Sequence, residues 1–177
     1  MKSEAEIREI LERYITSHFE GEVTLVPEFY LEDHARRIDI LTITEKYLIG
    51  FEIKSASDSL KRLENQVATY EKYLDKVIVV CSQKHIRDAE KILDPSIGLW
   101  EISDTGNIKK LRRGKLKKIK KEFLIRSLTV KDMKESLKVG NERIQRKVLS
   151  ERMKKEPHKS LKRLLVHSVT TRRVNKK

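Results

Sequence analysis

The sequence lacks most of the features by which common classes of protein are recognised. It has one cysteine, Cys81, in 177 residues, which excludes an internal disulfide framework and a cysteine-rich zinc site. No segment approaches the roughly 20 apolar residues that a helix needs to cross a bilayer. The first residues are charged and amphipathic, without the apolar stretch of a secretion signal. We therefore expect a cytoplasmic protein that has no membrane partner.

Motifs of several enzyme classes are also missing. The sequence contains no glycine-rich phosphate loop followed by Lys-Ser/Thr, which excludes nucleotide hydrolases of that type. It contains no Gly-x-Ser-x-Gly motif, which would position a serine nucleophile. The five histidines do not have the spacing of metal ligands. Any catalytic site must be built from other side chains.

Charge is abundant but unevenly distributed along the chain. Charged residues make up 38% of the sequence, and the net charge is +13. Residues 1–100 contain 14 Lys/Arg and 19 Asp/Glu, a net charge of −5, whereas residues 101–177 contain 26 and 8, a net charge of +18. An acidic half suits divalent cations, and a basic half suits a polyanion, most simply nucleic acid held through its phosphates. A solvated basic tail that only aids solubility is the alternative.

The spacing of apolar residues predicts an α/β fold. Helices are expected at 4–18, 58–74 and 85–93, and short strands at 22–31, 36–44, 47–54, 76–81, 98–103 and 107–112. The resulting order, α-β-β-β-α-β-α-β-β, predicts a mixed β-sheet flanked by helices. The short link Glu45-Lys46 predicts an antiparallel hairpin between the second and third strands.

The composition changes after Gly114, where basic helical segments begin. We expect residues 1–114 to form one domain and residues 115–177 to form a basic C-terminal helical extension. Its helices are expected between Thr129 and Gly140, from Asn141 to before Pro157, and from about residue 159.

Three polar residues interrupt the apolar strands predicted at 36–44 and 47–54. Asp39 lies in the first of these strands, and Glu52 and Lys54 lie in the second. Because strand side chains alternate, Glu52 and Lys54 should share one face, and Ile38 and Ile40 should point away from Asp39. A buried charge needs a partner, so we expect the three groups to converge. A cross-strand ion pair without further function is the alternative interpretation.

Two carboxylates beside an ammonium are suited to metal-assisted cleavage of a phosphodiester. Asp39 and Glu52 offer the oxygen ligands that Mg²⁺ or Mn²⁺ prefers, and the Ile53 carbonyl can add another. Lys54 can stabilise the charge that develops on the scissile phosphate. Gln66, in a helical row with Arg62 and Tyr70, can orient a water or hold a phosphate.

Several basic residues are candidates for phosphate contacts with nucleic acid. Arg36 and Arg37 directly precede the strand that carries Asp39, and a guanidinium matches phosphate geometry. The complete predicted set comprises Arg36, Arg37, Arg62, Lys117, Lys118, Lys120 and Lys121.

An acid on one strand, an acid-x-Lys on the next and a glutamine-bearing helix before a buried strand form a specific pattern. It resembles the PD-(D/E)XK nuclease superfamily, which covers restriction enzymes, junction resolvases and many repair nucleases. The resemblance covers roughly residues 4–103, and the α-β-β-β-α-β order through residue 81 is similar to the restriction-endonuclease-like core. By this resemblance Asp39 is the first acid and Glu52-Ile53-Lys54 is the (D/E)-x-K motif. Ile38 stands where the motif has proline, and the run from Asp58 to Tyr70 looks like a small bacterial and phage branch of unassigned function.

The resemblance implies a Mg²⁺-dependent deoxyribonuclease that hydrolyses DNA phosphodiester bonds in phage or bacterial DNA processing, recombination or repair. Its catalytic residues would be Asp39, Glu52, Lys54 and Gln66. Many members use a further acid, and the pattern does not choose among Glu6, Glu9, Glu12 and Glu28. The alternative is a non-catalytic DNA-binding protein with a nuclease-like fold, whose C-terminal helices imitate a helix-turn-helix. The extension could also form a homodimer, and the preferred structure of the DNA is left open.

Overall fold

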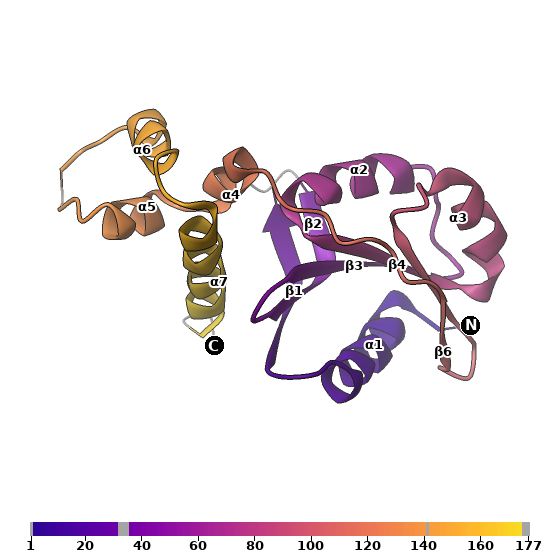
Figure 1. The fold of residues 1–177 in the computed structure, drawn as a ribbon. Helices are drawn as coiled ribbons and strands as arrows, with labels where there is room; N and C mark the ends of the chain where they lie inside the picture. The colour runs from indigo at the N-terminus through magenta and orange to yellow at the C-terminus, as the bar shows by residue number, and fades with distance from the viewer. Residues whose placement is uncertain (1, 32–35, 141, 175–177) are drawn as a thin grey trace.

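The centre of the molecule is one six-stranded sheet, seen in a computed structural model that describes residues 2–31, 36–140 and 142–174 (Figure 1). The strands lie in the sheet in their order along the chain: β1 (Val23–Leu31), β2 (Arg36–Thr44), β3 (Leu48–Lys54), β4 (Lys76–Ser82), β5 (Gly98–Ile102) and β6 (Ile108–Arg112). The first three strands are antiparallel, β3, β4 and β5 are parallel, and β6 is antiparallel to β5. The predicted α/β fold with a mixed sheet flanked by helices is confirmed, and so is the hairpin between β2 and β3.

The helices flank this sheet and form the C-terminal extension. They are α1 (Glu4–His18), α2 (Leu63–Tyr73), the short 3₁₀ helix η1 (Gln83–His85), α3 (Ile86–Ile92), α4 (Lys121–Ser127), α5 (Val130–Ser136), α6 (Arg146–Met153) and α7 (His158–Val174). α1 begins where the sequence predicted, because Ser3 and Glu6 each accept a hydrogen bond from the other's backbone N–H, which is a capping box. Among the described residues, none of the helices combines the length and the apolar character that spanning a bilayer requires.

Each face of the sheet buries its own apolar cluster. α1 packs on one face through Ile7, Leu11 and Ile15. The other face lies under α2 and α3 and continues into the C-terminal helices. β3 is therefore buried at every residue, which explains why its sequence is apolar throughout except for the residues of the candidate site.

The C-terminal helices share the buried cluster that lies under α2. Tyr73 of α2 meets Phe123 of α4 edge to face, with ring centroids 5.1 Å apart. Asp75, just before β4, accepts hydrogen bonds from the Leu48 N–H at 2.7 Å and from Lys162 Nζ of α7 at 2.7 and 2.8 Å. The extension is thus fastened at the amino ends of β3 and β4.

Two helix starts differ from the prediction, and the structure contains one helix that was not predicted. α2 begins at Leu63 and not at residue 58, because Asp58 accepts hydrogen bonds from the N–H and hydroxyl of Ser55 and holds residues 55–58 in a turn. The predicted helix from Asn141 begins at Arg146 instead, and Asn141 itself lies outside the described residues. α4 was not predicted as a separate helix, whereas Thr129 caps α5 as expected.

Candidate active site

Glu52 and Lys54 form a buried ion pair at the carboxyl end of β3. Alternation along the strand places both on the face covered by α2, as predicted. Lys54 Nζ donates to Glu52 Oε1 at 2.7 Å, and only 2% of Glu52 is exposed. A carboxylate this deeply buried needs several partners to stay charged.

The partners come from α2. Gln66 Nε2 donates to Glu52 Oε1 at 2.8 Å, and Tyr70 Oη lies 3.0 Å from Glu52 Oε2. Tyr70 Oη also lies 2.8 Å from the Arg37 carbonyl oxygen. A hydroxyl has one proton and can satisfy only one of these two acceptors at a time. Glu52 Oε2 can therefore bind a further partner, such as a cation.

Asp39 faces the same region from β2 through an interruption in the sheet. Pairing of β2 with β3 ends at Ile40 and Phe51, and beyond it the Ile53 N–H donates to Asp39 Oδ2 at 2.6 Å. The aspartate takes the place of a backbone acceptor. Because the N–H and C=O of one strand residue face the same neighbouring strand, the Ile53 carbonyl faces this gap as well.

The expectation that Ile38 and Ile40 both point away from Asp39 is wrong. Ile38 packs in the cluster under α2, and Ile40 packs in the cluster under α1. The alternation breaks where Glu28, opposite Asp39 in the register of β1, has a positive φ of 52° and drops out of the ladder. Gly50 accommodates the displaced side chain, because a Cβ there would lie 2.2 Å from Ile38 Cδ1.

The environment of Asp39 favours its protonated form. Burial contributes most, the charge of Glu52 comes next, and the Ile53 N–H acts in the opposite direction; together with Glu4 and Lys54 they raise the pKa of Asp39 from 3.8 to about 7. Burial and the neighbouring negative charge both disfavour the ionised carboxylate, and a positive partner would favour it. We call Asp39, Glu52, Lys54, Gln66 and Tyr70 the Glu52 cluster.

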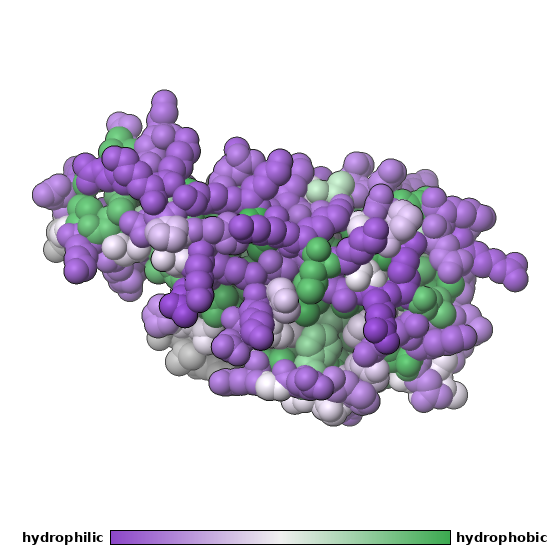
Figure 2. Space-filling model, viewed as in Figure 1, coloured by the Kyte–Doolittle hydropathy of each residue, from purple (hydrophilic) through white to green (hydrophobic). Residues whose placement is uncertain are grey.

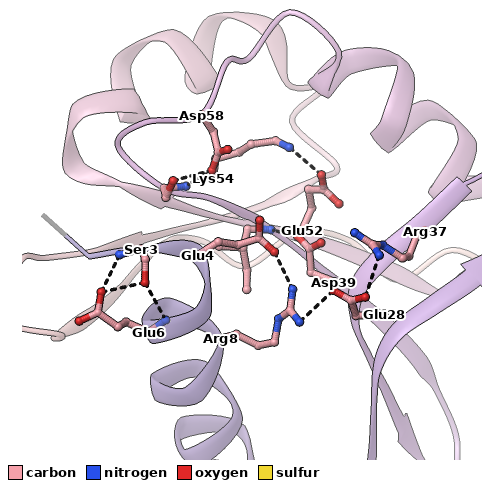
Figure 3. A network of polar contacts seen from close by, with 12 residues as sticks. Ser3, Glu4, Glu6, Arg8, Glu28, Arg37, Asp39, Glu52, Lys54 and Asp58 are labelled. Atoms are coloured by element: carbon pink, nitrogen blue, oxygen red, sulfur yellow. Dashed lines mark hydrogen bonds and ion pairs between the residues drawn. The ribbon is translucent and has the colours of Figure 1, made fainter.

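Glu4, in the first turn of α1, is an acid that the sequence analysis missed. Its charge is one of those acting on Asp39, and Figure 3 shows it pointing toward Asp39 and Glu52 from a third element. Arg8 Nη2 lies 2.5 Å from Glu4 Oε1 and so neutralises part of its charge. Its position could have suggested it, because Glu4 is three residues before the buried Ile7 and so lies on the same side of α1.

The four acids that the sequence left open have other positions. Glu6 belongs to the capping box with Ser3, and Glu9 is exposed and Glu12 half-buried on α1. Glu28 forms ion pairs with Arg8 at 3.0 Å and with Arg37 at 2.7 Å (Figure 3). Arg37, a predicted phosphate contact, is thus already paired with a carboxylate.

The other predicted phosphate contacts fall into two groups. Arg36 and Arg62 are exposed near the Glu52 cluster. The lysines of the extension lie toward the opposite end of β3, because the Lys117 N–H donates to the Asp75 carbonyl and the Asp75 N–H donates to the Leu48 carbonyl. Leu48 is four residues before Glu52, about 13 Å at about 3.3 Å per residue.

The lysines of that second group differ in whether their side chains already contact other residues. Lys117 pairs with Glu71 of α2, and Lys121 Nζ donates to the Lys154 carbonyl at 2.8 Å. Lys118 and Lys120 are exposed. The structure therefore gathers the predicted catalytic residues at one place but leaves the predicted lysine contacts at a distance from them.

The donor set of the cluster fits a hard divalent cation. Within the described residues, Asp39 Oδ1 accepts no hydrogen bond, and the one partner of Glu52 Oε2 is Tyr70, whose hydroxyl also lies beside a carbonyl. The described residues contain no group of three His, Cys, Asp or Glu side chains that could hold a metal. Mg²⁺ commonly binds through only one or two carboxylates and retains several waters, so two carboxylates and a nearby carbonyl suit it.

Replacing Asp39 with asparagine should stabilise the fold above neutral pH. The folded chain keeps a proton on Asp39 up to pH about 7, and the unfolded chain releases it near pH 4, so the free energy of unfolding of the wild type falls between these values. Asparagine can still accept from the Ile53 N–H but carries no charge. At pH 8 we expect Asp39→Asn to be about 1 to 4 kcal/mol more stable in urea unfolding, and at pH 4 nearly equal to wild type.

The matched control for this measurement is Asp88→Asn, since Asp88 is exposed on α3. That variant should follow the wild-type dependence on pH. An Asp39→Asn protein with the same pH slope as wild type would show that Asp39 is charged throughout this range.

Comparison with known proteins relates nearly the whole chain to one phage protein family. A family model described as bacteriophage P4 protein cII matches residues 1–176. Protein cII of Enterobacteria phage P4 is 32% identical over 87 residues, which are 49% of this chain and 33% of that protein, so the match spans about a third of the relative's length. Among solved structures, the SPO1766 protein of unknown function from Silicibacter pomeroyi is similar with a TM-score of 0.48 and 18% identity, over 62% of this chain and 70% of that chain.

Proposed function

The chain belongs to the bacteriophage P4 protein cII family, and we propose that it is a metal-dependent nuclease that hydrolyses phosphodiester bonds of DNA. The observation that carries the proposal is the convergence of Asp39 and Glu52, from adjacent strands, beside the ammonium of Lys54. A purely structural ion pair with Lys54 would need one carboxylate, whereas here the charge of Glu52 also raises the pKa of a second one, Asp39. The resemblance to PD-(D/E)XK nucleases points the same way.

Each residue of the cluster has a role in this proposal. Asp39, Glu52 and the Ile53 carbonyl would hold Mg²⁺ or Mn²⁺, and the chemistry that such an ion supplies is a bound water of lowered pKa and positive charge beside the phosphate oxygens. Lys54 donates a proton of its ammonium in a hydrogen bond to the scissile phosphate and stabilises the charge that builds up there. Gln66 and Tyr70 keep the Glu52 carboxylate in one orientation through the contacts at 2.8 and 3.0 Å.

DNA would be held mainly through its phosphates. Arg36 and Arg62 are exposed close to the cluster, and Lys118 and Lys120 would hold the strand further along the sheet. A dimer formed by the C-terminal helices would present two such clusters to the two strands of a duplex, and we include it in the proposal.

A second candidate function is DNA binding without cutting. The observation that favours it is the exposed positive charge of the C-terminal helices, away from the acids; the exposed cations include Arg126, Lys138, Arg143, Lys147, Arg152, Lys155, Lys159 and Arg163. Figure 2 shows hydrophilic side chains over most of this part of the molecule. α6 and α7 are joined by residues 154–157, but α6 packs mainly on α5 and α7 mainly on α4. They therefore lack the mutual packing of a helix-turn-helix, and binding would be through phosphates with a strong dependence on salt.

A calorimetric titration with Mn²⁺ at several pH values tests the proposal directly. We expect saturable binding that strengthens as pH rises and levels off above pH about 7, because the proton on Asp39 must leave before the carboxylate can bind a cation. The same protein should cut circular, linear or branched DNA with Mg²⁺ and lose this activity in EDTA.

Absence of Mn²⁺ binding at every pH, together with intact, salt-sensitive binding of DNA, would reject the nuclease and favour the second candidate. Comparison of the three DNA forms also shows whether cutting starts at ends or within strands.

A further inference from the structure

A second charged pocket lies on the other face of the sheet, where α1 ends. Lys76, Lys110 and Arg113 line a hollow of about 250 Å³ together with Phe19, the residue that ends α1, and Trp100 of β5. Trp100 belongs to the apolar cluster under α1, and the Glu52 cluster lies on the opposite face. The length of α1, about 20 Å at about 1.5 Å per residue, separates this hollow from Glu4.

None of the three cations has an anionic partner in the part of the chain that the structure describes. Within residues 2–31, 36–140 and 142–174, no carboxylate forms an ion pair with any of them. Burial, followed by the charges of Lys110 and Arg113, lowers the pKa of Lys76 from its ordinary value. The end of α1 supplies only about half a negative charge, so the pocket remains strongly positive.

Aromatic rings hold one of these cations in place. Lys110 Nζ lies 4.8 Å from the centre of the Trp100 ring and 5.2 Å from that of Tyr14, distances at which a cation is attracted to a ring face. Trp100 is 3% exposed, and its Nε1 is a buried donor with no hydrogen-bond partner among the described residues. The pocket thus has an ammonium that two aromatic rings position, and an anion would accept hydrogen bonds from it.

We propose that Lys76, Lys110 and Arg113 form a binding pocket for a phosphate group. A guanidinium and two ammonium groups match the charge and the acceptor oxygens of phosphate. Pockets that enclose a whole small molecule measure about 300 to 1,000 Å³, so a hollow of about 250 Å³ takes one phosphate or diphosphate of a larger ligand. That group is either part of a DNA strand or the end of a small phosphorylated compound. The proposal does not depend on the nuclease activity.

The single tryptophan of the chain provides the measurement. Because Trp100 lines this pocket, its indole N–H resonance and its fluorescence should change when a ligand binds there. We would titrate the full chain in EDTA with inorganic pyrophosphate and, separately, with a short single-stranded DNA. Saturable changes of the indole resonance with pyrophosphate are the expected result.

Lys110→Gln should weaken pyrophosphate binding about tenfold or more. Lys109→Gln is the matched control. Lys109 is next to Lys110 on the same strand and is also exposed, but it does not line the pocket. The substitution removes the same charge and should change binding less than about twofold. Arg113→Gln should act like Lys110→Gln, and thermal unfolding checks that each variant is folded.

The DNA titration identifies the source of the phosphate. If Lys110→Gln weakens DNA and pyrophosphate binding together, the pocket holds a strand of nucleic acid. If it weakens pyrophosphate alone, the ligand is a small phosphorylated compound. An indole resonance that moves with neither probe, or equal losses in Lys109→Gln and Lys110→Gln, overturns the proposal.

Discussion

Replacing Glu52 with glutamine should abolish Mg²⁺-dependent cutting of DNA and leave DNA binding in EDTA close to that of the wild type. Glutamine keeps the volume of the buried side chain and can still meet Gln66 and Tyr70, but it loses the charge that would attract a cation. Mutation of groups that merely orient metal ligands lowers affinity or activity about 10- to 100-fold, so loss of a direct ligand should cost at least about 100-fold. Cleavage of circular DNA measures the rate, and fluorescence anisotropy of labelled DNA measures the binding.

Glu64→Gln is the matched control for this experiment. Glu64 is exposed in the first turn of α2, so the same substitution there should leave the rate unchanged. Asp39→Ala is expected to behave like Glu52→Gln, whereas Lys54→Met should retain Mn²⁺ and lose cutting. Cutting at the wild-type rate by purified Glu52→Gln would falsify the proposed active site.

Replacing Asp75 with alanine should destabilise the protein more than any surface substitution. Asp75 is 5% exposed and accepts from both Lys162 Nζ and the Leu48 N–H. Removal of one member of a buried ion pair leaves the other charge without a partner and costs about 3 to 5 kcal/mol. We expect a loss of this size in the free energy of unfolding by urea, and release of α7 from the amino ends of β3 and β4.

The control for Asp75 is the more exposed pair between Lys117 and Glu71. Pairs in contact with solvent contribute about 0 to 1 kcal/mol, so Lys117→Ala should have a small effect, and it leaves the hydrogen bond from Ser96 Oγ to Glu71 in place. Combining Asp75→Asn with Lys162→Met should recover part of the loss, because neither partner then carries a buried charge. A loss below about 1 kcal/mol in Asp75→Ala would show that the pair does not hold α7 in place.

The sheet could be predicted because its strands are short, apolar and separated by clear turns. β3 and β4 are buried on both faces, and their continuous apolar runs are the expected consequence. The convergence of Glu52, Lys54, Gln66 and Tyr70 was also predictable, since strand alternation and helical spacing place polar groups on defined faces. Their proposed roles in catalysis stay predictions.

Other parts depend on contacts between residues far apart in the sequence. Asp75 and Lys162 are 87 residues apart, and no local pattern links them. The break in alternation at Asp39 lies opposite Glu28 on the neighbouring strand, which has a positive φ of 52°. Glu4 approaches Asp39 only because α1 packs across the sheet. Sequence spacing reports on one element at a time. The position of Glu4 three residues before Ile7 could suggest that it faces the sheet, but not that it approaches Asp39, and the other two features could not be read from spacing at all.

The shared core has a practical meaning for dissecting this protein by deletion. Ile119, Leu124 and Leu165 are buried in one cluster with Tyr73 and Leu74. A chain truncated after Gly114 would therefore expose an apolar surface along α2. Such a fragment would aggregate through this surface, and its failure to bind DNA would say nothing about the missing lysines. Charge-neutralising point substitutions on the exposed sides of α4 to α7 test the lysines and arginines directly, because they leave this apolar surface covered.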